Sequence, residues 1–286
     1  ALVGVGGYGR GELFPYSDVD VLILTDESPE DAQLAAIEGL IGKLWDIGLH
    51  LGHSVRTIAE CRSEAARDVT VLTALLESRW LAGARQRFAE FEREIAGSYD
   101  AAEFFQAKRL EQQQRHTKYQ DTPYALEPNC KESPGGLRDL HVLLWVSRAA
   151  GYGVSWSELL RRGLITREEH AMLGRSERTL KEVRARLHLV AGRREDRLVF
   201  DVQTAVAASA GLQAKGARRA SEVLMQRYYR AAKIVTQLNT IVLQNVEARL
   251  FPRSEQPATR IDAAFVARNE MLDIDDDRVL ERDPNA

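Results

Sequence analysis

The chain has 286 residues, of which 44% are hydrophobic and 28% charged, and its net charge is −3. This length and composition are typical of one large or two ordinary soluble globular domains, and the charge gives no reason to expect a nucleic-acid substrate. We identify no apolar run long enough for a membrane span and no signal peptide, and two cysteines without metal-ligand spacing, Cys61 and Cys130, indicate a reducing cytoplasm.

Three apolar segments near the N-terminus predict strands. They cover residues 2–5, 19–25 and 49–55, and in the last of them apolar residues alternate with other residues. The chain begins inside the first segment, and we therefore expect it to be a fragment that is trimmed at its N-terminus.

Two helices are predicted to alternate with these strands. Ser28, Pro29 and the acids that follow have the order of a helix start, with a cap, a proline in the first position and negative charge in the first turn. Thr57 and Glu60 have the spacing of a capping box, which marks the second helix. Residues 75–81 are typical of either a fourth strand or a helix end. The first helix carries an apolar stripe at helical spacing, formed by Leu34, Ile37, Leu40, Ile41, Leu44 and Trp45.

Residues 84–250 have the period of helices and predict a bundle. Thr166 and Glu169 form a further capping box. Residues 129–139 interrupt the helical pattern as a loop, and a helix with apolar residues at 140, 143, 144 and 146 follows. One long helix is indicated by apolar residues three and four apart, namely Leu224, Tyr228, Ala231, Val235, Leu238 and Val242.

The last residues, 251–286, are a polar tail with an acidic end, in which we predict two short strands at 261–266 and 271–274. The sequence thus predicts an α+β fold. A small mixed-sheet domain over residues 1–83 precedes a mostly helical domain over residues 84–250.

The stretch from Gly6 to Asp20 carries the main chemical signal. Side chains at i and i+2 of a strand point the same way, so Asp18 and Asp20 share a face with Cα atoms roughly 7 Å apart. Both carboxylates can therefore reach Mg²⁺ ions about 3.5–4 Å apart in a two-metal site. The glycines before them let backbone amides approach an anion. We predict a site for a nucleoside triphosphate with its metals.

Two common phosphate-binding motifs do not fit this stretch. No Gly-Lys-Ser/Thr follows the glycines, which excludes a Walker loop. Pro15 blocks the long helix that a Rossmann motif opens.

Further side chains near the glycines and in the loop at 129–139 are candidates for nucleotide binding. Lys131 and Arg138 flank a Pro-Gly-Gly turn at a helix start, which favours phosphate. The alternative is an interdomain connection in which Arg138 pairs with an acid. Ser133 and Asn129 are candidates for contacts with the base or ribose.

Arg10 and Ser17 have two interpretations each. Arg10 pairs with the triphosphate or serves as a surface or domain-bridging residue. Ser17 binds a phosphate or supports Asp18. The basic pairs at 161–162, 193–194 and 218–219 are interpreted as solvated helix surface.

The order of strand, glycine turn and strand with carboxylates at its mouth resembles the DNA polymerase β nucleotidyltransferase superfamily. Within it, the string from Gly6 to Asp20 resembles the bacterial PII uridylyltransferase/uridylyl-removing enzyme family. Residues 52–57 and 126–139 match that family as well, as do the pair at 115–116 and the Asp201 segment.

The resemblance implies a polymerase-β-like domain that transfers UMP from UTP to a tyrosine of the PII signalling protein and releases pyrophosphate. Asp18 and Asp20 would hold two Mg²⁺ ions, and the amides of Gly6 and Gly7 would hold the β- and γ-phosphates. The resemblance covers only the nucleotidyltransferase and helical regions of that family, so we expect its glutamine-sensing domains to be missing, and the absence of a His-Asp dipeptide predicts that the hydrolase metal site is missing too. We therefore expect transfer without removal, with glutamine sensed elsewhere.

One departure from the superfamily concerns its usual third carboxylate. The matching strand offers only His50 as a base, and Glu77 is a rival if residues 75–81 form a neighbouring strand. A third possibility is that no group completes the pair.

This departure keeps other functions open. One is an adenylyltransferase related to that of glutamine synthetase, although the loop at 129–139 and the strand at 52–57 favour uridylyl transfer. The other is a nucleotide-binding regulatory module with an impaired site.

Overall fold

The computed structural model describes residues 1–26, 29–252, 259–261, 265–268 and 271–274. Contacts between Cα atoms divide the chain into two units, Ala1–Val246 and Glu247–Ala286, and each is described by itself. In the part that the structure describes, no helix has the length and apolar character needed to cross a membrane. Cys61 and Cys130 are free and buried.

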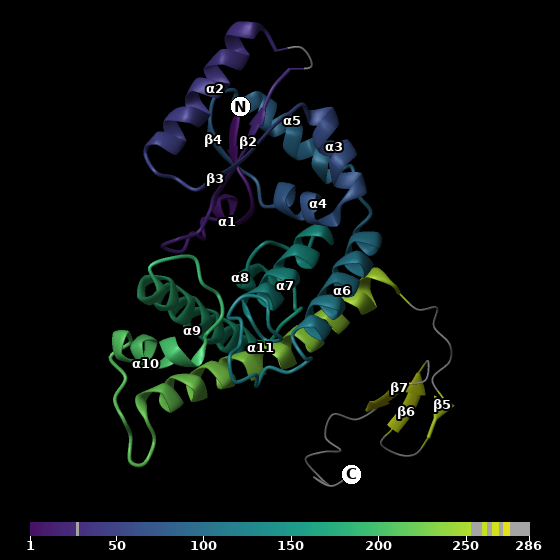
Figure 1. Cartoon of the computed structure of the whole chain (residues 1–286). Helices are drawn as coiled ribbons and strands as arrows, with labels where there is room; N and C mark the ends of the chain where they lie inside the picture. Colours follow the sequence, from purple (N-terminus) through teal and green to yellow (C-terminus); the bar gives the residue numbers. More distant parts are fainter. Residues whose placement is uncertain (27–28, 253–258, 262–264, 269–270, 275–286) are drawn as a thin grey trace. The chain divides into compact units, whose positions relative to one another are not determined.

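The first unit begins with a mixed sheet of four strands in the order β3-β2-β1-β4 (Figure 1). The strands are β1 (Leu2–Gly4), β2 (Val19–Leu24), β3 (Leu51–Arg56) and β4 (Arg79–Ala82). β1 is antiparallel to both of its neighbours, whereas β2 and β3 are parallel. The three strands predicted near the N-terminus are confirmed, and the small mixed sheet is as expected.

Five helices accompany this sheet among the described residues. They are α1 (Gly6–Gly9), α2 (Asp31–Asp46), α3 (Ile58–Arg67), α4 (Val69–Leu76) and α5 (Arg85–Ala96). The capping box at the start of α3 is confirmed. Both interpretations of residues 75–81 are partly right, because α4 ends at 76 and β4 begins at 79.

Helix α2 differs from its prediction in two ways. Its N-cap is Glu30, whose N–H donates to the Gln33 side chain at 3.2 Å, while Ser28 lies outside the described residues. Its apolar stripe is mostly uncovered: Ile41 is buried, but Leu40 is 38% and Trp45 53% exposed. Helical spacing gathers apolar residues on one face, but it does not supply a partner for that face.

The rest of the first unit is helical, as predicted. It contains α6 (Ala101–Lys118), α7 (Leu137–Ala149), α8 (Trp156–Arg161), α9 (Arg167–Ala191), α10 (Phe200–Ser209) and α11 (Ala220–Leu250). The 31 residues of α11 bury all six members of the predicted stripe, and the capping box at the start of α9 is confirmed.

The loop at 129–139 is fixed by the buried carboxylate of Asp139. That carboxylate accepts hydrogen bonds from Arg115 at 2.5 Å, from Gln112 at 3.0 Å and from the N–H of Gly135 at 2.7 Å, and His116 lies 2.9 Å away. These bonds join α6, the loop and the first turn of α7. Arg115 and His116, the pair that matches the family in sequence, therefore hold the loop that carries Lys131 and Arg138.

Gly135 brings the same loop against α11. It has φ +77°, and a Cβ there would lie 2.2 Å from the carbonyl oxygen of Ala232. The glycine is thus required by the close approach of two backbones. Asn239 of α11 completes the junction by donating to the carbonyl oxygen of Asp139 at 2.9 Å.

The second unit contains an antiparallel sheet of β5 (Thr259–Arg260), β6 (Phe265–Arg268) and β7 (Met271–Ile274). The strand predicted at 271–274 is confirmed. The strand predicted at 261–266 begins only at Phe265, and residues 262–264 lie outside the described part of the chain.

Candidate active site

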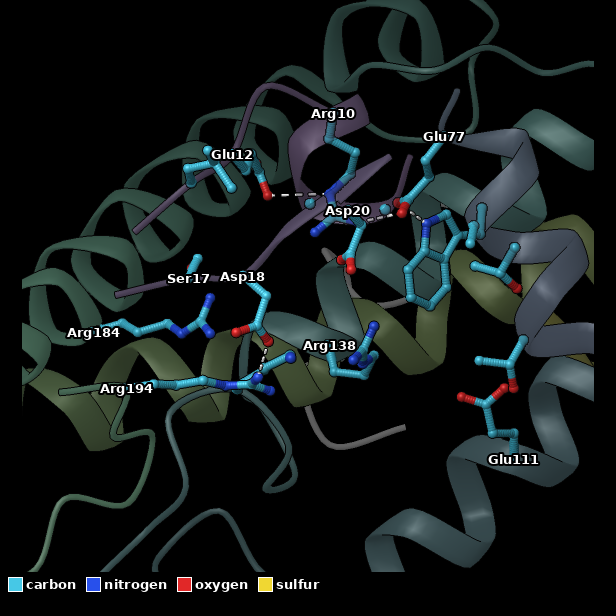
Figure 2. Close-up of a pocket in the computed structure, with 18 of the residues that line it drawn as sticks. Arg10, Glu12, Ser17, Asp18, Asp20, Glu77, Glu111, Arg138, Arg184 and Arg194 are labelled. Atoms are coloured by element: carbon cyan, nitrogen blue, oxygen red, sulfur yellow. Dashed lines mark hydrogen bonds and ion pairs between the residues drawn. The ribbon is translucent and has the colours of Figure 1, made fainter. Parts of the chain in front are cut away.

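A cavity of about 290 Å³ lies between the glycine segment, the start of β2 and the helical region (Figure 2). Eight of the nine predicted site residues line it, from segments more than 100 residues apart. They are Gly6, Gly7, Arg10, Ser17, Asp18, Asp20, Lys131 and Arg138.

The ninth, Ser133, lines a different cavity beside Tyr119 and Phe200. Its hydroxyl accepts the N–H of Asn129 at 2.9 Å, and the Asn129 side chain accepts the N–H groups of residues 131 and 132. Both side chains therefore hold the turn of the loop, and the structure does not bring Ser133 to the carboxylate pair.

Asp18 and Asp20 point into the cavity from the start of β2 (Figure 2). Burial and the neighbouring Asp18 charge raise the pKa of Asp20 above its usual value. Asp18 is paired with Arg194, which lies in the loop after α9. The interpretation of residues 193–194 as solvated helix surface is therefore wrong for Arg194, because α9 ends at Ala191 and the loop turns back to the sheet.

Mutual repulsion between two carboxylates on one face favours a bound cation. Hard oxygen donors suit Mg²⁺, which keeps several waters and takes further ligands from substrate phosphates. Asp18 and Asp20 thus fit a metal that a nucleotide helps to bind. The described residues contain no group of three or more His, Cys, Asp or Glu side chains that could hold a metal by themselves.

Gly52 occupies the position on β3 next to Asp20, where a third carboxylate would stand. Register pairs Gly52 with Asp20, and a Cβ on Gly52 would lie 2.4 Å from Oδ1 of Asp20. The carboxylate of Glu77 already has two partners, because Arg10 pairs with it and Trp145 donates a hydrogen bond to it. Of the two candidates for completing the pair, only His50 is exposed, and it lies in a second cavity beyond the carboxylates.

Replacing Gly52 with alanine is expected to lower catalytic activity by about 10²-fold. The added methyl group must displace the Asp20 carboxylate, and a shift of about 1 Å at a reacting centre has an effect of this size. The matched control is Gly42→Ala on α2, where a Cβ would meet no atom within 4 Å. Equal activities of Gly52→Ala and Gly42→Ala would contradict the prediction, because they would show that displacing the Asp20 carboxylate does not affect the reaction.

Six cations line the cavity. Burial and the nearby Arg138 lower the pKa of Lys131, and Arg138 itself is held by Glu132 at 3.0 Å, so the prediction that this arginine pairs with an acid is also met. Lys108 is 1% exposed and lies over the ring of Trp145 at 4.5 Å. Three of the cations come from helices and a loop distant in the sequence and were not among the predicted site residues. The full set is Arg10, Lys108, Lys131, Arg138, Arg184 and Arg194.

Glu12 joins the glycine segment to the helical region. It pairs with Lys181 of α9, with His141 of α7 at 3.0 Å and with Arg10 at 3.3 Å. Burial alone would raise its pKa, but hydrogen bonds from His141 and Lys181 hold the pKa of Glu12 well below its usual range. The two halves of the site are thus fixed to each other by one partly buried carboxylate.

Acidification is expected to weaken this junction. Burial, with Arg10 nearby, lowers the pKa of His141 to about 3, whereas an unfolded histidine has a pKa of about 6.5. Below pH 6.5 the unfolded chain takes up a proton that the folded chain does not, so stability falls by about 1.4 kcal/mol per pH unit. The free energy of unfolding, measured at pH 7 and pH 5, should fall about 2 kcal/mol more in the wild type than in His141→Gln. An equal loss of unfolding free energy in the wild type and in His141→Gln would contradict the lowered pKa of His141. The matched control is His170→Gln, because His170 takes no part in the contact with Glu12.

The mixed sheet, the single helical turn after β1 and the carboxylate pair at the mouth of β2 define a nucleotidyltransferase domain. The family model described as "Nucleotidyltransferase domain" matches residues 1–76, and the one described as "GlnD PII-uridylyltransferase" matches residues 103–243.

Curated proteins extend the match over the whole chain. A bifunctional uridylyltransferase/uridylyl-removing enzyme of Ralstonia nicotianae is 57% identical over 286 residues, which is 100% of this chain and 33% of that relative. Relatives with the same name in Cupriavidus pinatubonensis and Bordetella parapertussis are also 57% identical, over 100% and 99% of this chain and 33% of each relative. The chain belongs to the family of bacterial PII uridylyltransferases/uridylyl-removing enzymes, and it spans about a third of the length of the relatives it matches.

Proposed function

We propose that the chain transfers UMP from UTP to a tyrosine hydroxyl of the PII protein and releases pyrophosphate, with Mg²⁺ as the metal. The observation that carries this proposal is the carboxylate pair Asp18–Asp20 at the edge of a cavity whose opposite walls are cationic. The names of its relatives support uridylyl as the group transferred. Two free, buried cysteines agree with a cytoplasmic location.

The residues of the cavity mainly position the reactants and neutralise charge. The phenolic oxygen forms a bond to the α-phosphorus, the bond from that phosphorus to pyrophosphate breaks, and the phenolic proton passes to water. Asp18 and Asp20 would hold Mg²⁺, which lowers the pKa of the nucleophile and stabilises the leaving group. The N–H groups of Gly6 and Gly7 open α1 and would bind the β- and γ-phosphates.

Arginines and lysines on the facing wall would bind the remaining phosphate oxygens. Lys131 and Arg138 reach the cavity from the loop that Asp139 fixes. Arg194 can exchange Asp18 for a phosphate oxygen, which would leave the Asp18 carboxylate to the metal. Ser17 accepts the N–H of Phe14 at 3.1 Å, so it supports the turn that leads into Asp18.

One observation favours a second function, nucleotide binding without turnover. No carboxylate lies opposite Asp20, because Gly52 occupies that position. On that hypothesis the cavity would bind UTP as a regulatory signal.

A labelling assay tests the proposal. The chain is incubated with Mg²⁺, PII and UTP or ATP that carries a labelled α-phosphate. We expect label on PII from UTP. Faster labelling from ATP would indicate an adenylyltransferase, and UTP binding without labelling would indicate the regulatory module. Control by glutamine and removal of UMP would belong to parts of the longer relatives that this chain does not match.

A further inference from the structure

A second cavity, of about 420 Å³, adjoins the carboxylate pair. It shares only Asp18 and Asp20 with the first cavity. Its remaining walls come from the end of α2 and the start of β3, and they are formed by Trp45, Leu49, His50, Leu51 and Gly52. The two carboxylates thus line two cavities whose other walls differ.

The charges of the two cavities suit different reactants. Six lysines and arginines line the first cavity, whereas no lysine or arginine is among the described residues that line the second. A triphosphate therefore favours the first cavity. The described lining of the second cavity has no lysine or arginine to hold a phosphate, and it combines the two carboxylates with the side chains of Trp45, Leu49 and His50.

The lining of the second cavity contains apolar side chains that the fold leaves open. Trp45 is 53% and Leu49 37% exposed. The Trp45 ring packs against the ring of His53 in a T-shaped arrangement with centroids 5.6 Å apart, and about half of the residue remains exposed. Exposed tryptophans of this kind are frequent at the centre of protein interfaces.

The sheet also leaves room for an extended peptide. Strand β3 lies at the edge of the sheet, and among the described residues its outer side pairs with no strand. An open edge strand can bind an extended segment through its backbone N–H and C=O groups, with neighbouring pockets for alternate side chains. The groove at Trp45 is such a neighbouring pocket, because Leu51 and Gly52 of β3 line it.

The geometry of the reaction connects the two cavities. In phosphoryl-type transfer the attacking and leaving oxygens lie roughly in line, on opposite sides of the phosphorus. With pyrophosphate leaving toward the cations of the first cavity, the second cavity, which adjoins the same two carboxylates, is available to the nucleophile.

We propose that the groove of Trp45, Leu49 and His50 seats the acceptor segment that carries the reactive tyrosine. The proposal rests on the proposed function. The phenol ring lies against Trp45 and Leu49, its hydroxyl group reaches the α-phosphorus between Asp18 and Asp20, and the flanking backbone lies along β3. His50 supplies a polar side chain in the same groove.

The test measures binding of PII to the whole chain in the presence of Mg²⁺ and a non-hydrolysable UTP analogue, and UMP transfer in parallel. Trp45→Ala is expected to raise the Kd for PII and the KM for PII about 10- to 30-fold, as for an interface tryptophan. The KM for UTP should stay within about twofold. The matched control is Ile47→Ala, an apolar residue 71% exposed that does not line the groove, and it should change neither constant. Arg138→Ala should show the opposite pattern, with a raised KM for UTP alone.

Other results would overturn either the groove assignment or the proposed function, and the two failures are distinguishable. A higher KM for UTP in Trp45→Ala would assign the groove to the nucleobase. If Trp45→Ala changes only the unfolding temperature, the groove would be assigned to another part of the longer protein. If it changes only the oligomeric mass, the groove would be assigned to a second copy of the chain. Binding of PII that depends on Trp45, without any UMP transfer by the wild type, would support the groove and reject the proposed function. A wild type that does not bind PII would reject both.

Discussion

A chain that carries Asp20→Asn is expected to bind UTP and to transfer UMP about 10³ times more slowly than the wild type. The substitution keeps the shape of the side chain opposite Gly52 but removes one of the two charges that would hold the metal. A factor of 10³ corresponds to about 4 kcal/mol, which is within the transition-state stabilisation that a bound metal supplies. Steady-state transfer from labelled UTP measures the effect.

The fold of the Asp20→Asn variant should be unharmed. Burial and Asp18 raise the pKa of Asp20, so folding places its carboxylate in a less favourable environment than it has in the unfolded chain. Replacing it with a neutral isostere should leave the unfolding temperature equal or raise it. Asp121→Asn, at an exposed position with φ 50° that asparagine also adopts, is the matched control. Transfer at the wild-type rate by Asp20→Asn would reject the carboxylate pair as the metal site.

The second large effect concerns stability. Asp139→Ala is expected to lower the free energy of unfolding by about 3–5 kcal/mol, because it removes the carboxylate that pairs most closely with the nearly buried guanidinium of Arg115. The side chain of Asp139 is 0% exposed, and Arg115 is 9% exposed. Denaturant unfolding measures the loss. The same variant should bind UTP more weakly, since Asp139 fixes the loop that carries Lys131 and Arg138.

Two comparisons make the Asp139 prediction specific. Asp201→Ala, an exposed acid in the first turn of α10, should cost at most about 1 kcal/mol. Burial alone would raise the pKa of Asp139, but hydrogen bonds and charges from His116 and Arg115 hold it below its usual value. Its contribution is therefore present above the unfolded pKa of about 3.9 and is lost as the pH falls through the folded pKa. A loss of less than about 1 kcal/mol in Asp139→Ala would contradict this role.

The local part of the site could be predicted because it depends on local rules. Alternation along one strand places Asp18 and Asp20 on one face, and the structure has both in one cavity. A proline and a turn limit the helix after the glycines, and α1 is indeed a single turn.

The distant part of the site could not be predicted, because it depends on how segments fold back. Arg194 follows Asp18 by 176 residues, and a basic pair in a sequence gives no sign of which element it will face. Lys108 has the sequence context of a surface residue on α6 but is buried over Trp145. Ser133 stands in the right loop, yet its hydroxyl is used by the turn. Only the register of β2 and β3 shows that Gly52 closes the third position.

Helix α2 shows the same limit for packing. The periodicity of its apolar residues is real, but Trp45 and Leu40 remain open to solvent in this chain. Spacing identifies an apolar face, and a partner for that face has to come from a separate observation. For Trp45 that observation is the neighbouring carboxylate pair.

The intact mass of PII after incubation with the chain, UTP and Mg²⁺, measured together with the pyrophosphate released, tests the central claim most directly. We predict one uridylyl group on a tyrosine of each modified PII subunit, one pyrophosphate for each group added, and neither product with Asp20→Asn. PII that stays unmodified while the chain binds UTP would contradict the claim, as would pyrophosphate release that continues in Asp20→Asn.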